Sequence, residues 1–204
     1  MLNPSALNWM AKQFEEENNE EMAYRCYLES AMSEKDGKAL FNLGKMYLFG
    51  DYVVEDYDKA GHYFKLAYET GYSLPGSSYI IIANCKEEER TETWESKMNW
   101  YRLAADHGCD HGYECMGFMY MKKGEYLMAI DYFLIPEKKT TTSLYNLGKI
   151  YDEGLGVEPD LEKAIEYYKR TVIDCWDVKE YGDELFEKAR ARLRELGIII
   201  EEPA

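Results

Sequence analysis

The chain has 204 residues and a formal net charge of −15, from 39 acidic and 24 basic side chains. A field of this sign repels phosphate groups, which disfavours general binding to nucleic acid or to an anionic membrane. No apolar run approaches the roughly 18 residues that cross a bilayer, and the first residues lack the basic and apolar regions of a secretory signal, so we expect a cytoplasmic protein.

Helical periodicity runs along the chain and predicts five helix–turn–helix repeats followed by a final helix. Two stretches, 39–66 and 143–170, align without a gap and share Asn-Leu-Gly-Lys, a glycine-bearing turn and Asp-x-x-Lys-Ala. Such agreement within one chain indicates a repeated structural unit. We therefore expect a single all-α solenoid over residues 1–204, with repeats at about 5–33, 37–71, 77–108, 110–136 and 141–174 and a C-terminal capping helix within 177–198.

The second repeat predicts what individual positions do. Gly44 lies in mid-helix, where glycine costs roughly 1 kcal/mol against Ala, so we expect it to let the partner helix approach closely. Asp56 is placed to cap the second helix and Gly71 to end it. In the third repeat, we expect the first helix to span 77–90.

Two further patterns predict the core. The terminal helix, about 184–196, places Leu185, Ala189, Leu193 and Leu196 on one face, as an end cap of an array requires. An aromatic residue also recurs on the second helix of every repeat, beside small side chains, which favours a core position over a ligand platform. These aromatic residues are Tyr27, Phe64, Tyr101, Phe133 and Tyr168.

The signature LGxxYxxGxGVxxDxxKAxxYY, read from residues 147–168, strongly resembles the Sel1-like repeat, a variant of the tetratricopeptide repeat. The resemblance covers about residues 5–175. It implies antiparallel helix pairs stacked into a right-handed superhelix, with the first helices lining a concave groove. Proteins of this family usually act as adaptors that hold other proteins or peptides, and the resemblance implies the same class of function here.

The residue after the mid-helix glycine should turn toward this groove, because each helical step rotates by about 100°. Three repeats place a lysine there, the other two place Asn and Phe, and an aromatic residue and Asn lie nearby in the best-matched repeats. The predicted groove residues are Lys12, Phe41, Asn42, Lys45, Asn84, Phe118, Tyr145, Asn146 and Lys149. In related tetratricopeptide domains, Asn and Lys at such places hold peptide backbone and carboxylates, which implies an acidic or C-terminal peptide as partner. The alternative is that these lysines only solvate a helix face.

Metal binding and catalysis have weaker support. The segment 106–115 contains His107, Cys109, His111 and Cys115, whose side chains are of the kinds that bind zinc. Gly108 within it matches the helix-ending glycine of the second repeat, however, so an ordinary junction between repeats is favoured. No Ser/His/Asp or Cys/His set stands out, and we expect no enzyme activity, no metal and no cofactor.

Cysteine usage bears on one alternative function. A secreted, cysteine-rich branch of the family resembles β-lactamases, and its members pair cysteines within each repeat. The five cysteines here, at 26, 85, 109, 115 and 175, show no spacing that recurs between repeats, which predicts reduced thiols. A hydrolase of that branch and a self-associating assembly module stay open as alternatives to an adaptor.

Overall fold

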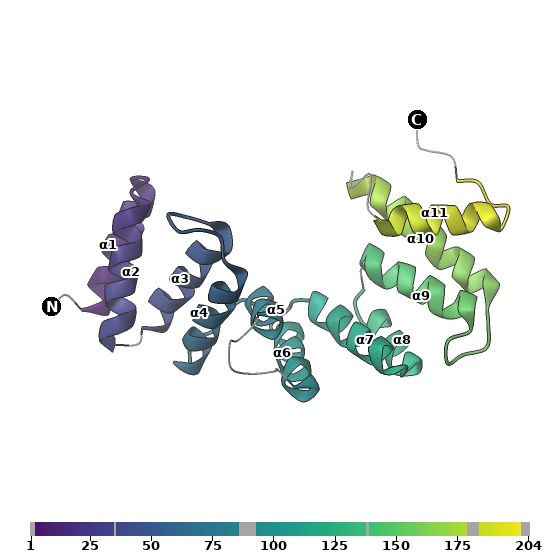
Figure 1. Cartoon of the computed structure of the whole chain (residues 1–204), viewed down its shortest axis with the longest axis horizontal. Helices are drawn as coiled ribbons and strands as arrows, with labels where there is room; N and C mark the ends of the chain where they lie inside the picture. Colours follow the sequence, from purple (N-terminus) through teal and green to yellow (C-terminus); the bar gives the residue numbers. More distant parts are fainter. Residues whose placement is uncertain (1–2, 35, 86–92, 138, 179–183, 201–204) are drawn as a thin grey trace. The chain divides into compact units, whose positions relative to one another are not determined.

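The computed structural model describes residues 3–34, 36–85, 93–137, 139–178 and 184–200. Within these residues the regular structure is entirely helical, which confirms the predicted all-α class (Figure 1). Consecutive helices pack on one another from α1 to α6 and again from α8 to α11, as expected for helix–turn–helix repeats. The helices are α1 (Pro4–Glu16), α2 (Glu20–Glu34), α3 (Gly37–Phe49), α4 (Tyr57–Glu69), α5 (Gly76–Asn84), α6 (Trp94–Asp106), α7 (His111–Lys123), α8 (Tyr126–Leu134), α9 (Thr141–Glu153), α10 (Leu161–Val178) and α11 (Glu184–Glu195).

The chain divides into two compact units. Unit 1 is Met1–Gly112 and contains α1 to α6, while unit 2 is Tyr113–Ala204 and contains most of α7 and all of α8 to α11. Each unit has its own buried apolar residues. The single continuous array over residues 1–204 therefore stays a prediction. None of the described helices is both long and apolar enough to cross a membrane.

Within each of three helix pairs, a glycine of the first helix lies against an aromatic ring of the second. A Cβ atom added at Gly44 would lie 2.5 Å from the ring of Phe64, and one added at Gly148 would lie 2.8 Å from the ring of Tyr168. Gly117 has the same relation to Phe133, at 2.5 Å. The expected close approach is confirmed, and it accounts for glycine in mid-helix despite its low helix propensity.

The predicted helix ends of the second repeat are also confirmed. The Asp56 carboxylate accepts a hydrogen bond from the backbone N–H of Lys59 at 2.9 Å, as an N-cap does. Gly71 has a φ of 84° just beyond α4, in the left-handed region that glycine adopts without a Cβ penalty. Asp160 repeats the cap at α10, with the N–H of Lys163 at 3.0 Å.

The structure corrects two predicted helices. The first helix of the third repeat ends at Asn84, because Cys85 takes an extended conformation, so the predicted span of 77–90 is too long; residues 86–90 lie outside the described part. In α11, Phe186 is buried with Ala189 and Leu193, while Leu185 is only half-buried. The spacing i, i+3, i+7 starts at Phe186, one residue later than predicted, and this stripe packs against α10.

Candidate partner-binding surfaces

In unit 1, the predicted groove lysines lie on the first helices of the first two pairs. Lys12 on α1 is exposed and forms no ion pair or ring contact within the described residues. Lys45 on α3 is half-buried, and its ammonium nitrogen lies 5.7 Å from the centroid of the Phe41 ring, one turn earlier on the same face. Among the residues that the structure describes, neither ammonium group has a carboxylate partner, although the chain is acidic.

The other predicted groove residues of unit 1 have packing roles. The ring of Phe41 lies 5.5 Å from that of Phe64 and 5.7 Å from that of Tyr72, between centroids. Asn42 is only 8% exposed. Asn84 is exposed, and its side-chain oxygen accepts a hydrogen bond from the Tyr101 hydroxyl at 2.7 Å. The contacts of Phe41 hold the surface of α3 that also carries Lys45.

In unit 2, as in unit 1, the aromatic and Asn residues of the predicted groove are packed while the lysine is accessible to solvent. The ring of Tyr145 lies 5.8 Å from that of Tyr168, and the ring of Phe118 contacts Phe133 edge to face at 5.5 Å. The side-chain amide of Asn146, a residue 9% exposed, donates to a backbone carbonyl of its own helix at 2.7 Å. Lys149 is half-exposed and lies 3.9 Å from the Glu153 carboxylate, a solvated i, i+4 pair that contributes little stability.

A second repeated feature joins the turn to the two helices of a pair. Tyr47 stacks on Tyr63 with centroids 5.4 Å apart and planes at 10°, and Tyr151 stacks on Tyr167 at 5.9 Å and 10°. Lys163 lies over the Tyr151 ring at 5.0 Å. Lys59, 3.2 Å from the capping Asp56, occupies the equivalent place over Tyr47, so these motif positions are structural.

Burial and hydrogen bonding shift the pKa values in this feature. Burial raises the pKa of the Tyr167 hydroxyl above its ordinary value. The backbone N–H of Lys163, helped by its ammonium group, lowers the pKa of Asp160. Both shifts follow from a capped helix start beside a packed ring pair, and each moves the pKa of its own group further from neutral pH.

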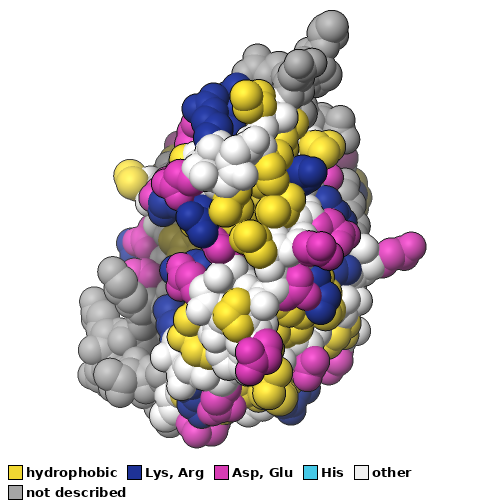
Figure 2. Space-filling model, turned by 90° about the vertical axis from the view of Figure 1, so that its right-hand side faces the viewer, with side chains coloured by type: hydrophobic (Ala, Val, Ile, Leu, Met, Phe, Trp, Pro, Cys, Tyr) yellow, Lys and Arg dark blue, Asp and Glu magenta, His cyan; other side chains and the backbone are white. Residues whose placement is uncertain are grey.

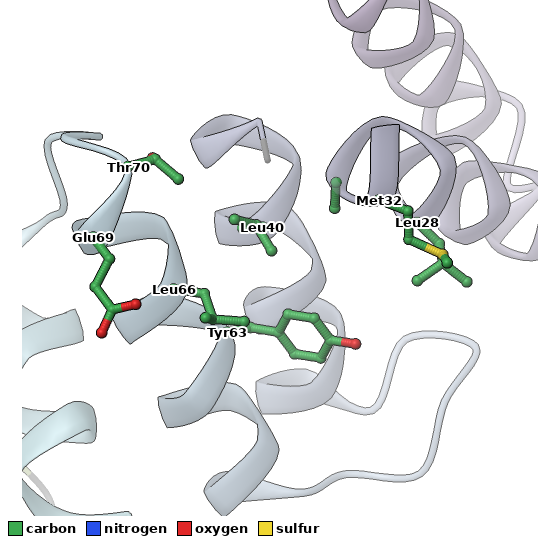
Figure 3. A pocket seen from close by; sticks show the side chains of 8 residues that line it. Leu28, Met32, Leu40, Tyr63, Leu66, Glu69 and Thr70 are labelled. Atoms are coloured by element: carbon green, nitrogen blue, oxygen red, sulfur yellow. The ribbon is translucent and has the colours of Figure 1, made fainter. Parts of the chain in front are cut away.

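Sequence reasoning missed a cleft of about 790 Å³ on unit 1 (Figure 3). It is lined by side chains from α2, α3 and α4 and by Thr70, which follows α4; apolar side chains dominate its wall, and Glu69 is the charged one. Met32, which lines it from α2, is 77% exposed. The sequence signal that could have predicted this cleft is a difference in side-chain size between equivalent positions of the second and third repeats, and no motif marks it.

The cysteine and histidine residues form no metal centre in the described structure. Cys26, Cys109 and Cys115 are free thiols, the thiol of Cys85 donates to the Ile82 carbonyl, and the side chain of Cys175 lies outside the described part. Among the described residues, no group of three or more His, Cys, Asp or Glu side chains is placed to hold a metal ion. The ring of His107 instead packs on Tyr79, with centroids 4.9 Å apart.

The C-terminal end of unit 2 is closed by α11, as predicted. Its buried stripe packs on Ala164, Tyr168 and Val172 of α10. Arg192 also binds Asp152 of α9 in bidentate fashion, with N–O distances of 2.7 and 2.9 Å. Figure 2 shows acidic and basic side chains interspersed with apolar ones on the face at this end of the chain.

The Asp152–Arg192 pair predicts a pH-dependent stability. Hydrogen bonds from Arg192 lower the folded-state pKa of Asp152 below its value of about 3.9 in unfolded chains. The contribution of the pair is therefore complete above that value and is lost as the pH falls through the lowered pKa. We expect Asp152→Asn to cost about 1–3 kcal/mol at neutral pH, measured by urea unfolding of unit 2.

The matched comparison is the same measurement in strong acid. There, wild type and Asp152→Asn should have nearly equal free energies of unfolding, because the wild-type carboxyl is protonated too. An equal difference at both pH values would show that the charged pair does not stabilise the cap.

Comparisons with known proteins agree with this geometry. The Sel1 repeat profile matches residues 37–72, 98–109 and 141–171. A Sel1 repeat protein from Oxalobacter formigenes has a similar fold, with a TM-score of 0.62 at 22% identity over 98% of this chain and 88% of that one. The MamA protein is also similar, with a TM-score of 0.53 at 16% identity over 88% of this chain and 95% of its own.

The chain therefore carries Sel1 repeats at three stretches, the second and fifth helix pairs and part of the third. It shares the helical-repeat fold of Sel1-repeat proteins over nearly its whole length.

Proposed function

We propose that this protein is a non-catalytic scaffold that holds a protein or peptide partner on the first helices of its pairs. The observation that carries the proposal is the recurrence of lysine at one repeat position of a chain with a net charge of −15. In unit 1 these are Lys12 and Lys45, neither of which pairs with a carboxylate within the described residues. A local cation in an acidic surrounding favours a partner that brings its own carboxylates.

The partner chemistry follows from this arrangement. An extended acidic segment, or a chain end with its free carboxylate, would pair with the ammonium groups of Lys12 and Lys45 in unit 1, or with that of Lys149 in unit 2. In this proposal the neighbouring aromatic and Asn residues do not contact the partner but hold the helix surface that carries the lysines in place. These residues are Phe41, Asn42, Tyr145 and Asn146. Their burial and internal contacts support that role.

The free thiols bear on the hydrolase alternative. Members of that branch pair cysteines within each repeat, whereas Cys26, Cys109 and Cys115 have free thiols here. This supports an interaction role over hydrolysis.

The lysine surface of unit 1 gives a binding prediction. Lys12→Ala/Lys45→Ala should bind an acidic peptide with a free C-terminus about twofold to thirtyfold more weakly than wild type, because each exposed contact contributes about 0.2–1 kcal/mol. Titration calorimetry at low salt measures the change. The matched control is Lys97→Ala/Arg102→Ala, which removes the same charge from the second helix α6. Equal weakening in both variants would refute the lysine surface and leave only a general charge effect.

A further inference from the structure

The cleft between α2 and α4 has a filled counterpart elsewhere in unit 1. The next space of the same kind, between α4 and α6, is filled by the rings of Tyr68, Tyr79 and Trp100. Their centroids lie 5.2–6.3 Å apart, and the His107 ring packs on Tyr79 at 4.9 Å. Unit 1 therefore contains one filled and one open copy of the same inter-helix space.

The repeat alignment identifies the positions that differ. A Cβ atom added at Gly37 would lie 2.6 Å from the Cβ of Tyr72, and one added at Gly76 would lie 2.7 Å from the Cβ of Cys109, which is the equivalent position of the next repeat, so the two spaces correspond. All four aromatic positions of the filled space have smaller counterparts lining the cleft: Ala31 for Tyr68, Leu40 for Tyr79, Tyr63 for Trp100 and Thr70 for His107. The missing ring volume is the space seen in Figure 3.

The walls of the cleft have the shape of a helix-binding groove. Leu28, Ala31 and Met32 lie on one face of α2 at i, i+3 and i+4, and Tyr63 and Leu66 are spaced by three residues on α4. Two such helical faces with an apolar floor can hold the apolar face of a third helix. The large exposed fraction of Met32 leaves apolar area that a partner would remove from water.

We infer that this cleft binds one amphipathic helix of a basic partner protein. Glu69 is the charged residue at its wall, and the whole chain carries a net charge of −15, so Lys or Arg beside the apolar face of the incoming helix would be complementary. A second copy of this chain would bring the same negative charge. This surface lies on different side chains from the lysine surface, and the inference does not depend on the proposed function.

The test uses a synthetic helical peptide with Leu on one face and Lys on the other, followed by fluorescence anisotropy. Ala31→Tyr/Leu40→Tyr rebuilds two of the rings of the filled space, and it should bind the peptide at least about tenfold more weakly than wild type because the cleft is occupied. Met32→Gln should weaken binding by up to about tenfold, because burial of a methionine side chain is lost. Val54→Gln, at a site 87% exposed outside the cleft, should bind as wild type does.

Three controls separate the occupants. A peptide with Glu in place of Lys, and a scrambled Lys/Leu peptide without an apolar face, should both bind weakly. Lys12→Ala/Lys45→Ala should retain the helical peptide, which distinguishes this surface from the lysine surface. Circular dichroism checks that each variant folds. If Ala31→Tyr/Leu40→Tyr does not fold, Met32→Gln alone still tests whether the peptide binds in the cleft.

Several results would overturn the inference. Unchanged binding in Met32→Gln and in the filled variant would place the peptide elsewhere. Equal binding of the scrambled peptide would reduce the effect to general charge attraction. Sedimentation that shows a dimer abolished by Met32→Gln would make a second copy the occupant.

Discussion

Replacing Phe64 with Ala should lower the free energy of unfolding of unit 1 by about 3–5 kcal/mol. Phe64 is 1% exposed, and its ring fills the space left by Gly44 and contacts the ring of Phe41. Its removal leaves a cavity between α3 and α4 that the surrounding helices can close only in part. Urea unfolding followed by circular dichroism measures the change.

The control for this prediction is a ring at the surface of the same helix pair. Phe49, at the end of α3, is 66% exposed, so Phe49→Ala should change stability by no more than about 0.5 kcal/mol. A Phe64→Ala protein that unfolds at the wild-type urea concentration would contradict the core assignment of the recurring aromatic residue.

Gly44→Ala should destabilise unit 1 by about 1–3 kcal/mol, although helix propensity alone predicts a gain of roughly 1 kcal/mol. The new methyl group would lie 2.5 Å from the Phe64 ring and 3.2 Å from the Ala60 carbonyl oxygen. The buried ring and the backbone must both move to admit it. The sign of the change therefore separates packing from propensity.

A double-mutant cycle isolates this contact. In a Phe64→Ala background the ring is absent, so Gly44→Ala should become neutral or stabilising, with a coupling energy of about 0.5–3 kcal/mol. Additive effects of the two substitutions would show that glycine and ring do not act on each other.

The repeat made much of the fold predictable. Gly44, Asp56 and Gly71 each have a local physical signature, a helix-breaking propensity, a capping side chain or a left-handed turn, and the structure confirms each role. The periodic aromatic residues, exemplified by Tyr168, likewise proved to be core. Period and propensity are sufficient where a contact recurs in every copy.

The remaining features depend on differences between copies. The open cleft exists because Ala31 and Leu40 are smaller than their counterparts Tyr68 and Tyr79. A sequence does not reveal this cleft, because it forms only when α2, α3 and α4 are placed side by side. The burial of Phe186 rather than Leu185 depends on which face α11 turns toward α10, because both residues border the same apolar stripe and only the packing partner selects between them.

The candidate site shows the same limit. The sequence places Asn146 beside the groove lysine, but the pattern does not reveal that its side-chain amide donates to a backbone carbonyl of its own helix. Tyr145 is one of the predicted groove residues, and its ring lies against that of Tyr168 in the core. Lys12 and Lys45 remain candidates for partner binding. A sequence pattern does not show whether a long charged side chain packs on the protein or is free to bind a partner.

Affinity capture from the source cell, with wild type and Lys12→Ala/Lys45→Ala side by side, tests the scaffold proposal most directly. The proposal predicts that wild type captures a partner in an amount close to its own. The double variant should lose most of that partner while its circular dichroism spectrum shows that it is folded. The control Lys97→Ala/Arg102→Ala should retain that partner. Capture of the same proteins in the same amounts by wild type and both variants would contradict a partner held through the first helices.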